Sequence, residues 1–242
     1  MQRFDLAPGF VLHSRPYQET SLLLELFTRE QGRFGAIAKG ARRPKSRARG
    51  LLQPFIPLLL SCSGRGELLT LREFENYKGE YYLPGSWLVF GFYVNELIHR
   101  LLHRFDPHPE LFDSYCQVLR ALGTVADSTQ KILRLFEKKL LKAIGYELTL
   151  TKEALTERPI DPDAWYAFDP SLGLRLVEGF DPKADDYRDQ AKMLLFRGRS
   201  LLALEQDQLE DPTILKEAKR LMRAALGWHL GDRPLESRKL LR

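Results

Sequence analysis

Cysteine is scarce in this sequence, and long apolar runs are absent. The 242 residues include two cysteines, Cys62 and Cys116, in different segments. This count excludes a disulfide framework and a cysteine-rich zinc site, and it indicates a reducing, cytoplasmic setting. Apolar stretches such as 58–60 and 87–93 are far too short to span a bilayer. No apolar run followed by small residues opens the chain, so we expect no signal peptide and no membrane contact.

The sequence also lacks the short motifs of nucleotide-dependent and hydrolytic enzymes. Gly35 and Gly40 have the spacing of a phosphate-binding loop, but Ala41 and Arg42 follow where Lys and Ser or Thr are required. There is no G-x-G-x-x-G fingerprint and no G-x-S-x-G nucleophile elbow. We therefore predict no catalytic residue and no cofactor. An enzyme whose site assembles only in the folded chain stays an alternative.

One stripe of residues could be imagined as a metal site. Glu96, His99 and His103 follow one helical face at i, i+3 and i+7. A di-metal helical bundle needs a second acidic-histidine pair, which the sequence does not contain. We interpret the stripe as the boundary of a core-facing surface and predict no metal.

Acidic residues are missing from one long stretch near the N-terminus. There is no Asp or Glu between Gln31 and Gly66. Residues 1–80 carry 13 Lys and Arg against 8 Asp and Glu, whereas residues 81–242 carry 24 of each, so the net charge of +5 lies in the first third. A one-signed segment this dense points to a polyanionic partner. We predict DNA-binding roles for its eight bases, which are Arg33, Lys39, Arg42, Arg43, Lys45, Arg47, Arg49 and Arg65.

The first 75 or so residues have the alternating pattern of β-strands. Five short strands without intervening helices, and with one long connection between the third and fourth, predict a small closed barrel. Pro54 and Pro57 are expected to confine the fourth strand to a sheet edge or a bulge. The predicted strands are 10–14, 21–28, 33–39, 55–61 and 67–74.

From Ser86 onward the apolar period becomes helical, which predicts a second, mainly helical domain. The segment 147–189 is irregular and acidic, with one hairpin of 166–168 against 174–177. We place the domains at 1–80 and 81–242. The predicted helices are 86–104, 110–122 closed by Gly123, 127–144 capped by Asp127 or Ser128 and closed by Gly145, 193–204, and 211–230 with Asp211 as N-cap.

The basic loop, residues 39–50, gives the strongest functional signal. A small barrel that binds single-stranded nucleic acid needs a cationic track for phosphates and exposed aromatic faces for bases. The basic loop supplies the track. Phe34, Phe55 and Tyr77 could stack on bases, although we expect core positions for the two phenylalanines. The alternative is a solvated basic loop with no partner.

Two further basic segments allow more than one interpretation. Arg134, Lys138 and Lys142 border an apolar helix stripe, and such a groove suits an acidic peptide that ends in an aromatic residue. Alternatively, these are surface side chains lying over a core face. The bases of 212–242 could extend the anion-binding track or neutralise the acidic segment 147–189, and both interpretations stay open.

Several motifs closely resemble the RecO family of bacterial DNA repair proteins. They are dense in the first 70 residues and cover nearly the whole chain. These motifs are 11–16, 19–22, 27–28, 32–33, 38–42, 52–55, 57–58, 64–68, 93–97 and 234–239.

The resemblance implies an α+β protein with an N-terminal five-stranded OB-fold barrel followed by a mainly α-helical domain. It implies a recombination mediator that binds ssDNA and dsDNA and anneals complementary strands. Such a mediator helps RecA to displace single-strand-binding protein, works with RecR, and consumes no nucleotide. Family members also contact the acidic C-terminal tail of single-strand-binding protein, whose chemistry matches the groove predicted at Arg134.

The resemblance also sets limits on cofactor and cellular location. Many relatives carry a four-cysteine zinc motif, but residues 148–179 contain no cysteine, so zinc is not expected here. A cytoplasmic location at the nucleoid is implied. The alternative function is a generic OB module that binds single-stranded nucleic acid without mediator activity, and therefore ignores single-strand-binding protein and RecR.

Overall fold

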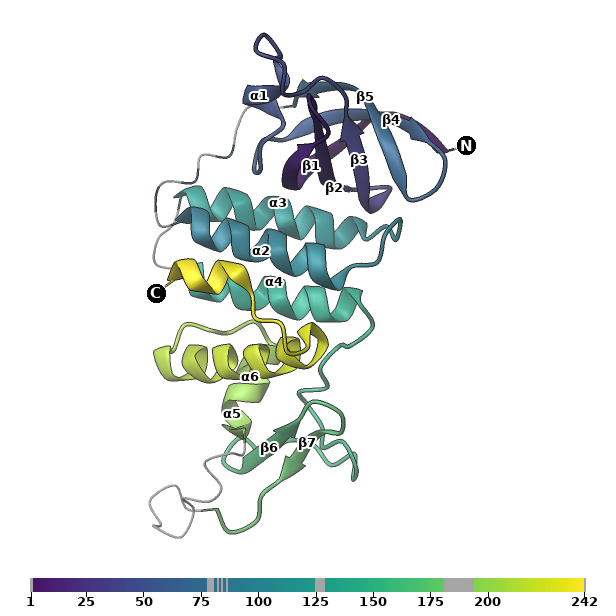
Figure 1. The fold of residues 1–242 in the computed structure, drawn as a ribbon. Helices are drawn as coiled ribbons and strands as arrows, with labels where there is room; N and C mark the ends of the chain where they lie inside the picture. The colour runs from purple at the N-terminus through teal and green to yellow at the C-terminus, as the bar shows by residue number, and fades with distance from the viewer. Residues whose placement is uncertain are drawn as a thin grey trace. The chain divides into compact units, whose positions relative to one another are not determined.

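The structure is a computed structural model that describes residues 2–77, 81, 83, 85, 87–124, 129–180 and 194–241 (Figure 1). Its contacts divide the chain into two compact units. The first comprises Met1–Ala126 and Pro234–Arg242, and the second comprises Asp127–Arg233. The sequence boundary at residue 80 separates strands from helices, whereas the contacts group the first two long helices with the strands.

The first unit contains a closed five-stranded barrel in the order β1-β2-β3-β5-β4. All neighbours are antiparallel except β3 and β5, which run parallel. This arrangement confirms the predicted α+β class with an N-terminal OB-like barrel. Its elements are β1 (Gln2–Tyr17), β2 (Ser21–Thr28), β3 (Gly32–Ala38), the short helix α1 (Ala48–Leu51), β4 (Leu58–Gly64) and β5 (Leu68–Asn76).

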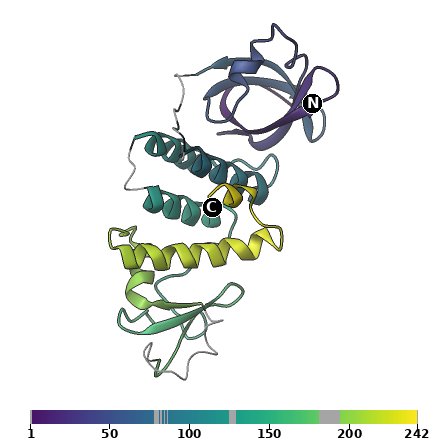
Figure 2. The same cartoon turned by 60° about the vertical axis from the view of Figure 1, so that its left-hand side comes forward.

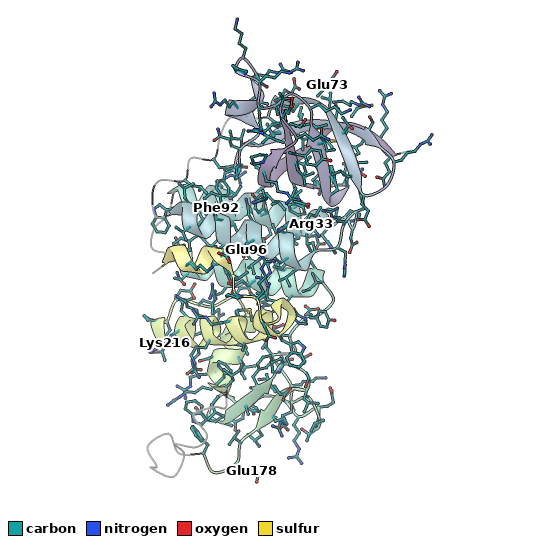
Figure 3. The ribbon with its side chains drawn as sticks, viewed as in Figure 1. Arg33, Glu73, Phe92, Glu96, Glu178 and Lys216 are labelled. Atoms are coloured by element: carbon teal, nitrogen blue, oxygen red, sulfur yellow. The ribbon has the colours of Figure 1, made fainter. Side chains whose placement is uncertain are left out.

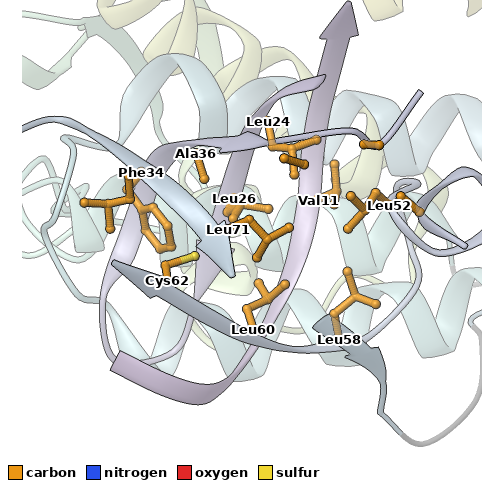
Figure 4. Packing of buried hydrophobic residues seen from close by; sticks show 14 of the residues in the cluster. Val11, Leu24, Leu26, Phe34, Ala36, Leu52, Leu58, Leu60, Cys62 and Leu71 are labelled. Atoms are coloured by element: carbon orange, nitrogen blue, oxygen red, sulfur yellow. The ribbon is translucent and has the colours of Figure 1, made fainter. Parts of the chain in front are cut away.

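Alternate side chains of the strands fill the barrel. Leu24, Leu26, Phe34 and Leu60 are completely buried and meet inside it (Figure 4). Phe55 is also buried, so the expected core positions of Phe34 and Phe55 are confirmed. The period of two therefore builds one apolar centre and leaves every second side chain on the outer surface.

The fourth strand differs from its prediction. β4 pairs with β1 on one side and with β5 on the other, so it is not a sheet edge. The strand begins at Leu58, directly after Pro57, and both prolines lie outside it. Proline cannot donate to a β-ladder, and here it ends the preceding loop instead of interrupting the strand.

Two long helices and the C-terminal tail complete the first unit. They are α2 (Trp87–Leu101), α3 (Pro109–Thr124) and the 3-10 helix η2 (Glu236–Leu241). α3 continues to Thr124, so Gly123 lies within its last turn and does not close it as predicted. Asn95 of α2 donates from its side-chain amide to the Leu12 carbonyl at 3.1 Å and accepts a hydrogen bond from the Tyr115 hydroxyl at 2.7 Å. These bonds tie α2 and α3 to β1.

In its described residues, the second unit combines three helices with a three-stranded sheet of order β7-β6-β8. In both views α5 lies between α6 and this sheet (Figures 1 and 2). The predicted hairpin is confirmed as β6 paired with β7. The elements are α4 (Thr129–Ala143), β6 (Trp165–Asp169), β7 (Gly173–Leu176), β8 (Leu195–Arg197), α5 (Gly198–Glu205) and α6 (Pro212–Leu230).

The predicted helix 193–204 is wrong at its start. Residues Leu195–Arg197 form β8, which pairs with β6, and α5 begins only at Gly198. A Cβ at Gly198 would lie 1.9 Å from the Asp161 carbonyl oxygen, so the chain passes too close for any larger residue. The predicted caps Asp127 and Ser128 lie outside the described residues, as do Asp181, Asp185, Asp186 and Asp189 of the acidic segment.

Candidate nucleic-acid interface

The basic loop is fastened to the barrel by three small or apolar side chains. Ala41, Ala48 and Leu52 are buried in the same core cluster as the inward-facing strand residues. The charged residues between and beside these anchors point outward, because the anchors occupy the inner side of the loop. The exposed cations are Lys39, Arg42, Arg43, Lys45, Arg47 and Arg49.

Consecutive turns give the basic loop a defined shape. The Arg43 amide donates to the Gly40 carbonyl at 3.1 Å, and the Ser46 amide donates to the Arg43 carbonyl at 3.0 Å. Gly40 has φ of +68°, a left-handed conformation that favours glycine, and it starts this series of turns. The cations are therefore carried on a folded segment.

Two of the loop arginines also hold the loop in place. Arg42 donates to the carbonyls of Gln18 and Glu19 in the β1–β2 turn, both at 3.2 Å. The Arg47 guanidinium lies 5.3 Å from the centroid of the Phe74 ring. Within the described residues, no acidic side chain forms an ion pair with any of the six exposed loop cations. Their charge is available to a polyanion.

Arg65 does not join the other predicted contacts. It lies in the turn before β5, and because β5 runs parallel to β3 with Leu68 opposite Gly35, this turn lies toward the Gly32 end of β3. The basic loop instead leaves β3 at the other end, after Ala38. Strands of this length separate the two ends by about 20 Å. The structure thus brings Lys39 to Arg49 together and leaves Arg65 at the opposite end of the barrel.

Arg33 is placed differently from the expectation. Its guanidinium pairs with the Glu25 carboxylate at 2.9 Å and donates to the Leu102 carbonyl at 3.1 and 3.0 Å. The side chain is 12% exposed. Burial lowers the pKa of Arg33, and the neighbouring Glu25 charge opposes that change. Arg33 therefore joins the barrel to the end of α2, and its charge is already balanced.

Sequence reasoning missed the other members of this contact. Arg104 also pairs with Glu25, and its guanidinium lies above Gly35, where an added Cβ would be 3.5 Å away. Glu25 and Arg104 are far apart in the chain, so no local pattern connects them. Gly35 in the middle of a strand was the available signal, because glycine there often marks a close approach.

The outer face of β2 and β3 is partly covered. Oligonucleotides often bind this face in OB-folds. Here the Phe27 ring packs against Phe112 at 5.4 Å and against Tyr115 at 5.9 Å, both from α3. The β1–β2 turn, whose Gln18 and Glu19 carbonyls accept the hydrogen bonds of Arg42 from the basic loop, is exposed at both of these residues. Of the three aromatic residues considered for base stacking, only Tyr77 is not buried.

The predicted peptide groove has its three cations held by three different partners. Arg134 is 6% exposed and pairs with the buried Glu137 at 2.7 Å. Lys138 donates to the carbonyls of Leu204 and Glu205 at the end of α5, and Lys142 pairs with Glu147 at 2.8 Å. Arg134 is buried and Lys138 is half-buried, whereas the Lys142 side chain is 63% exposed, so the three cations are held at different depths by separate partners.

The Glu96, His99 and His103 stripe has structural contacts. The Glu96 carboxylate accepts hydrogen bonds from the amides of Glu236 and Ser237, both at 2.9 Å, and so anchors the start of η2 (Figure 3). His99 lies 4.0 Å from Glu25. The described residues contain no group of three or more His, Cys, Asp or Glu arranged to hold a metal ion. No helix among the described residues is both long and apolar enough to cross a membrane.

Comparison with known proteins assigns both parts of the chain to one family. The family described as "Recombination protein O N terminal" matches residues 1–79, and "Recombination protein O C terminal" matches residues 86–239. The chain is 47% identical over 240 residues to "DNA repair protein RecO" of Nitrosococcus oceani, covering 99% of this chain and 93% of that protein. It is 43% identical to the proteins of the same name in Nitrosospira multiformis (100% and 96% covered) and Coxiella burnetii (99% and 99% covered).

Proposed function

This chain belongs to the RecO family of DNA repair proteins, and on that premise we propose that it acts as a recombination mediator without enzymatic activity. It binds ssDNA and dsDNA, anneals complementary strands, and assists the loading of RecA onto ssDNA coated with single-strand-binding protein. RecR is its partner in this step. The observation that carries the proposal is the basic loop, a folded segment with six exposed cations and no ion pair to an acidic residue of the described chain.

The basic loop supports binding to the sugar-phosphate backbone. Arg43, Lys45 and Arg49 are exposed, and no hydrogen bond from their side chains is recorded among the described residues. They are therefore free to neutralise phosphates, which releases condensed counterions and makes binding depend on salt. Contacts to phosphates do not distinguish between base sequences, and they form with single and double strands alike.

The same chemistry supports annealing. Two complementary strands repel each other through their phosphates, and a cationic surface reduces that repulsion. No bond is made or broken and no nucleotide is needed. This agrees with a sequence that has neither a Walker-type lysine nor a dinucleotide fingerprint.

The direct test is the salt dependence of ssDNA binding by the triple variant Arg43→Gln, Lys45→Gln and Arg49→Gln. Loss of three phosphate contacts should make the slope of log K against log salt shallower by about two, because each single-strand contact contributes roughly 0.7. Binding should weaken equally for all base sequences. The measurement is fluorescence anisotropy of labelled oligonucleotides over a salt series.

A matched control removes the same charge elsewhere in the first unit. Arg3→Gln, Arg29→Gln and Arg120→Gln change three exposed arginines outside the basic loop, and this variant should keep the wild-type slope. Equal effects of the two triple variants would show that only net charge matters. An unchanged slope in the basic-loop variant would remove this loop from the interface. Arg42 and Arg47 are left intact because their side chains also hold the loop.

Contact with the acidic tail of single-strand-binding protein remains part of the proposal, with the second unit as its site. Arg134, Lys138 and Lys142 each have an acidic partner in the structure, so an acidic tail that uses these cations would compete with those partners. A peptide matching that tail, titrated against the full-length protein, tests the contact. A generic OB module would bind ssDNA through the basic loop but would ignore this peptide and RecR.

A further inference from the structure

Helix α6 carries four cations on one exposed face. Lys216, Lys219, Arg220 and Arg223 stand at i, i+3, i+4 and i+7, which places them on the same side of the helix. All four are exposed, and Figure 3 labels Lys216 on this helix. At 1.5 Å per residue they cover about 10 Å of the helix axis. We call these four residues the α6 cationic face.

The α6 cationic face has a single sign of charge. The opposite side of the helix is buried through Ala218, Leu221 and Met222. The one acidic residue between Pro212 and Leu230 is Glu217, and its carboxylate accepts a hydrogen bond from the Arg197 amide at 3.0 Å. Glu217 is thus engaged at the start of α5 and does not alternate with the exposed cations.

Several other cations of the second unit form ion pairs, whereas none of these four does so with an acidic residue of the described chain. Lys131 pairs with Glu210, Lys142 with Glu147 at 2.8 Å, Lys152 with Glu157 at 3.6 Å, and Arg199 with Asp163. In the part of the unit that the structure describes, no ion pair joins the α6 cationic face to an acidic side chain. Arg220 lies over the Phe196 ring at 5.3 Å, which fixes its stem but leaves its charge uncompensated.

A buried ion pair of α4 lies close enough to the α6 cationic face to influence Lys219. Arg134 of α4 pairs with Glu137 through one nitrogen, while its buried Nε has no hydrogen-bond partner among the described residues. Burial lowers the pKa of Lys219, the charges of Arg134 and Arg223 lower it further, and the charge of Glu137 opposes this change. Like charges at i and i+4, here Lys216 with Arg220 and Lys219 with Arg223, destabilise a helix. A bound anion would relieve this repulsion.

We propose that the α6 cationic face binds the phosphate backbone of a second nucleic-acid strand, separately from the strand held by the basic loop. The four cations form a row about 10 Å long on a convex helix surface. One strand of a B-form duplex carries about three phosphates over that length, at 3.4 Å of helix axis per phosphate. An acidic peptide is held better by a groove with an apolar floor. The inference rests on the proposed annealing function, because annealing requires that two strands be held at once.

The test is capture of a second strand by protein already bound to a first. One oligonucleotide is immobilised and saturated with the full-length protein, and a labelled, non-complementary oligonucleotide is then added, so that base pairing cannot retain it. The variant Lys216→Gln, Lys219→Gln, Arg220→Gln and Arg223→Gln should capture the second strand at least tenfold less than wild type. Its affinity for the first strand should change less than threefold.

A charge-matched control separates site from net charge. Lys131→Gln, Lys142→Gln, Lys152→Gln and Arg199→Gln remove the same four charges from cations that have acidic partners, and capture should persist. Glutamine is a good helix former, so the α6 variant should keep its thermal midpoint. If the α6 variant captured the second strand as efficiently as wild type does, the proposal would be overturned. The proposal would also be overturned if a poly-glutamate peptide bound to wild type through these same four residues without displacing the labelled strand.

The two proposals fail in different ways. If the basic-loop triple variant binds a first strand as tightly as wild type, the proposed function loses its site, whatever the α6 variant does. If the basic-loop variant loses the first strand and the α6 variant still captures a second one, only the α6 inference fails.

Discussion

Glu25 balances the charges where the barrel meets α2. Its carboxylate pairs with Arg33 at 2.9 Å and with Arg104, and His99 lies 4.0 Å away. The residue is 9% exposed, so these partners replace most of its hydration. Arg33 of β3 and Arg104, which follows α2, thus share one buried acid, and Arg104 also lies 3.7 Å from the exposed Glu67. Arg33 lies in the basic first third of the chain, but its charge is balanced by Glu25 and is therefore not available to DNA.

Replacing Glu25 by glutamine should destabilise the protein. Glutamine keeps the volume of the side chain but leaves the Arg33 guanidinium without an acidic partner and leaves Arg104 only its 3.7 Å pair with the exposed Glu67, which costs about 2–3 kcal/mol because Arg104 is a third exposed. Urea unfolding followed by circular dichroism measures this change. The control is Asp5→Asn, which breaks the exposed pair with Arg3 and should change stability by less than about 0.5 kcal/mol. Equal effects would contradict the role of Glu25.

The start of α6 shows how a local signal in the sequence becomes structure. The Asp211 side chain accepts hydrogen bonds from the amides of Thr213 at 2.7 Å and Ile214 at 3.1 Å, and Pro212 occupies the first turn. These bonds lower the pKa of Asp211 below its usual 3.8. The carboxylate therefore stabilises the folded state at neutral pH, and this contribution is lost as pH falls through the lowered pKa.

Removal of this cap should produce a stability loss that depends on pH. Asp211→Ala should lower the thermal midpoint by about 2–4 °C at pH 7. The difference from wild type should shrink at pH values below about 3.8, where the wild-type carboxyl also becomes protonated. Asp211→Asn serves as the control, because an amide oxygen can cap the helix at any pH. A gap that is constant with pH would show that the charge of Asp211 does not contribute.

Local sequence patterns predict most of the helices and strands, but not which strands pair with one another. Alternation identified β2 and β3 within one residue, and the Asp-Pro pair identified the start of α6. The strand β8 was assigned to a helix because three apolar residues before a helical stretch look like its first turn. These residues pair with β6, which lies about 30 positions earlier in the chain, so the local spacing of apolar residues does not predict the pairing.

For the molecule as a whole, charge was the most reliable guide to the candidate site. The acid-free stretch predicted the basic loop, and the structure places six of its cations on the surface. The positions of Arg33 and Arg65 could not be predicted, because they depend on which strand end meets which helix. The sequence predicts that the bases of 212–242 either extend the anion-binding track or neutralise the acidic segment 147–189, and it does not separate the α6 cationic face from the other bases. Only the folded unit shows which C-terminal bases have acidic partners and which do not.

The central claim is that the basic loop gives this protein its strand-annealing activity on coated DNA. The most direct test is annealing of complementary oligonucleotides coated with single-strand-binding protein, without ATP, by wild type and by the Arg43→Gln, Lys45→Gln, Arg49→Gln variant. We predict that wild type accelerates annealing and that the variant does so at least tenfold less. Acceleration on bare strands alone would reduce the protein to a generic OB module. Equal acceleration by wild type and variant would contradict the role of the basic loop.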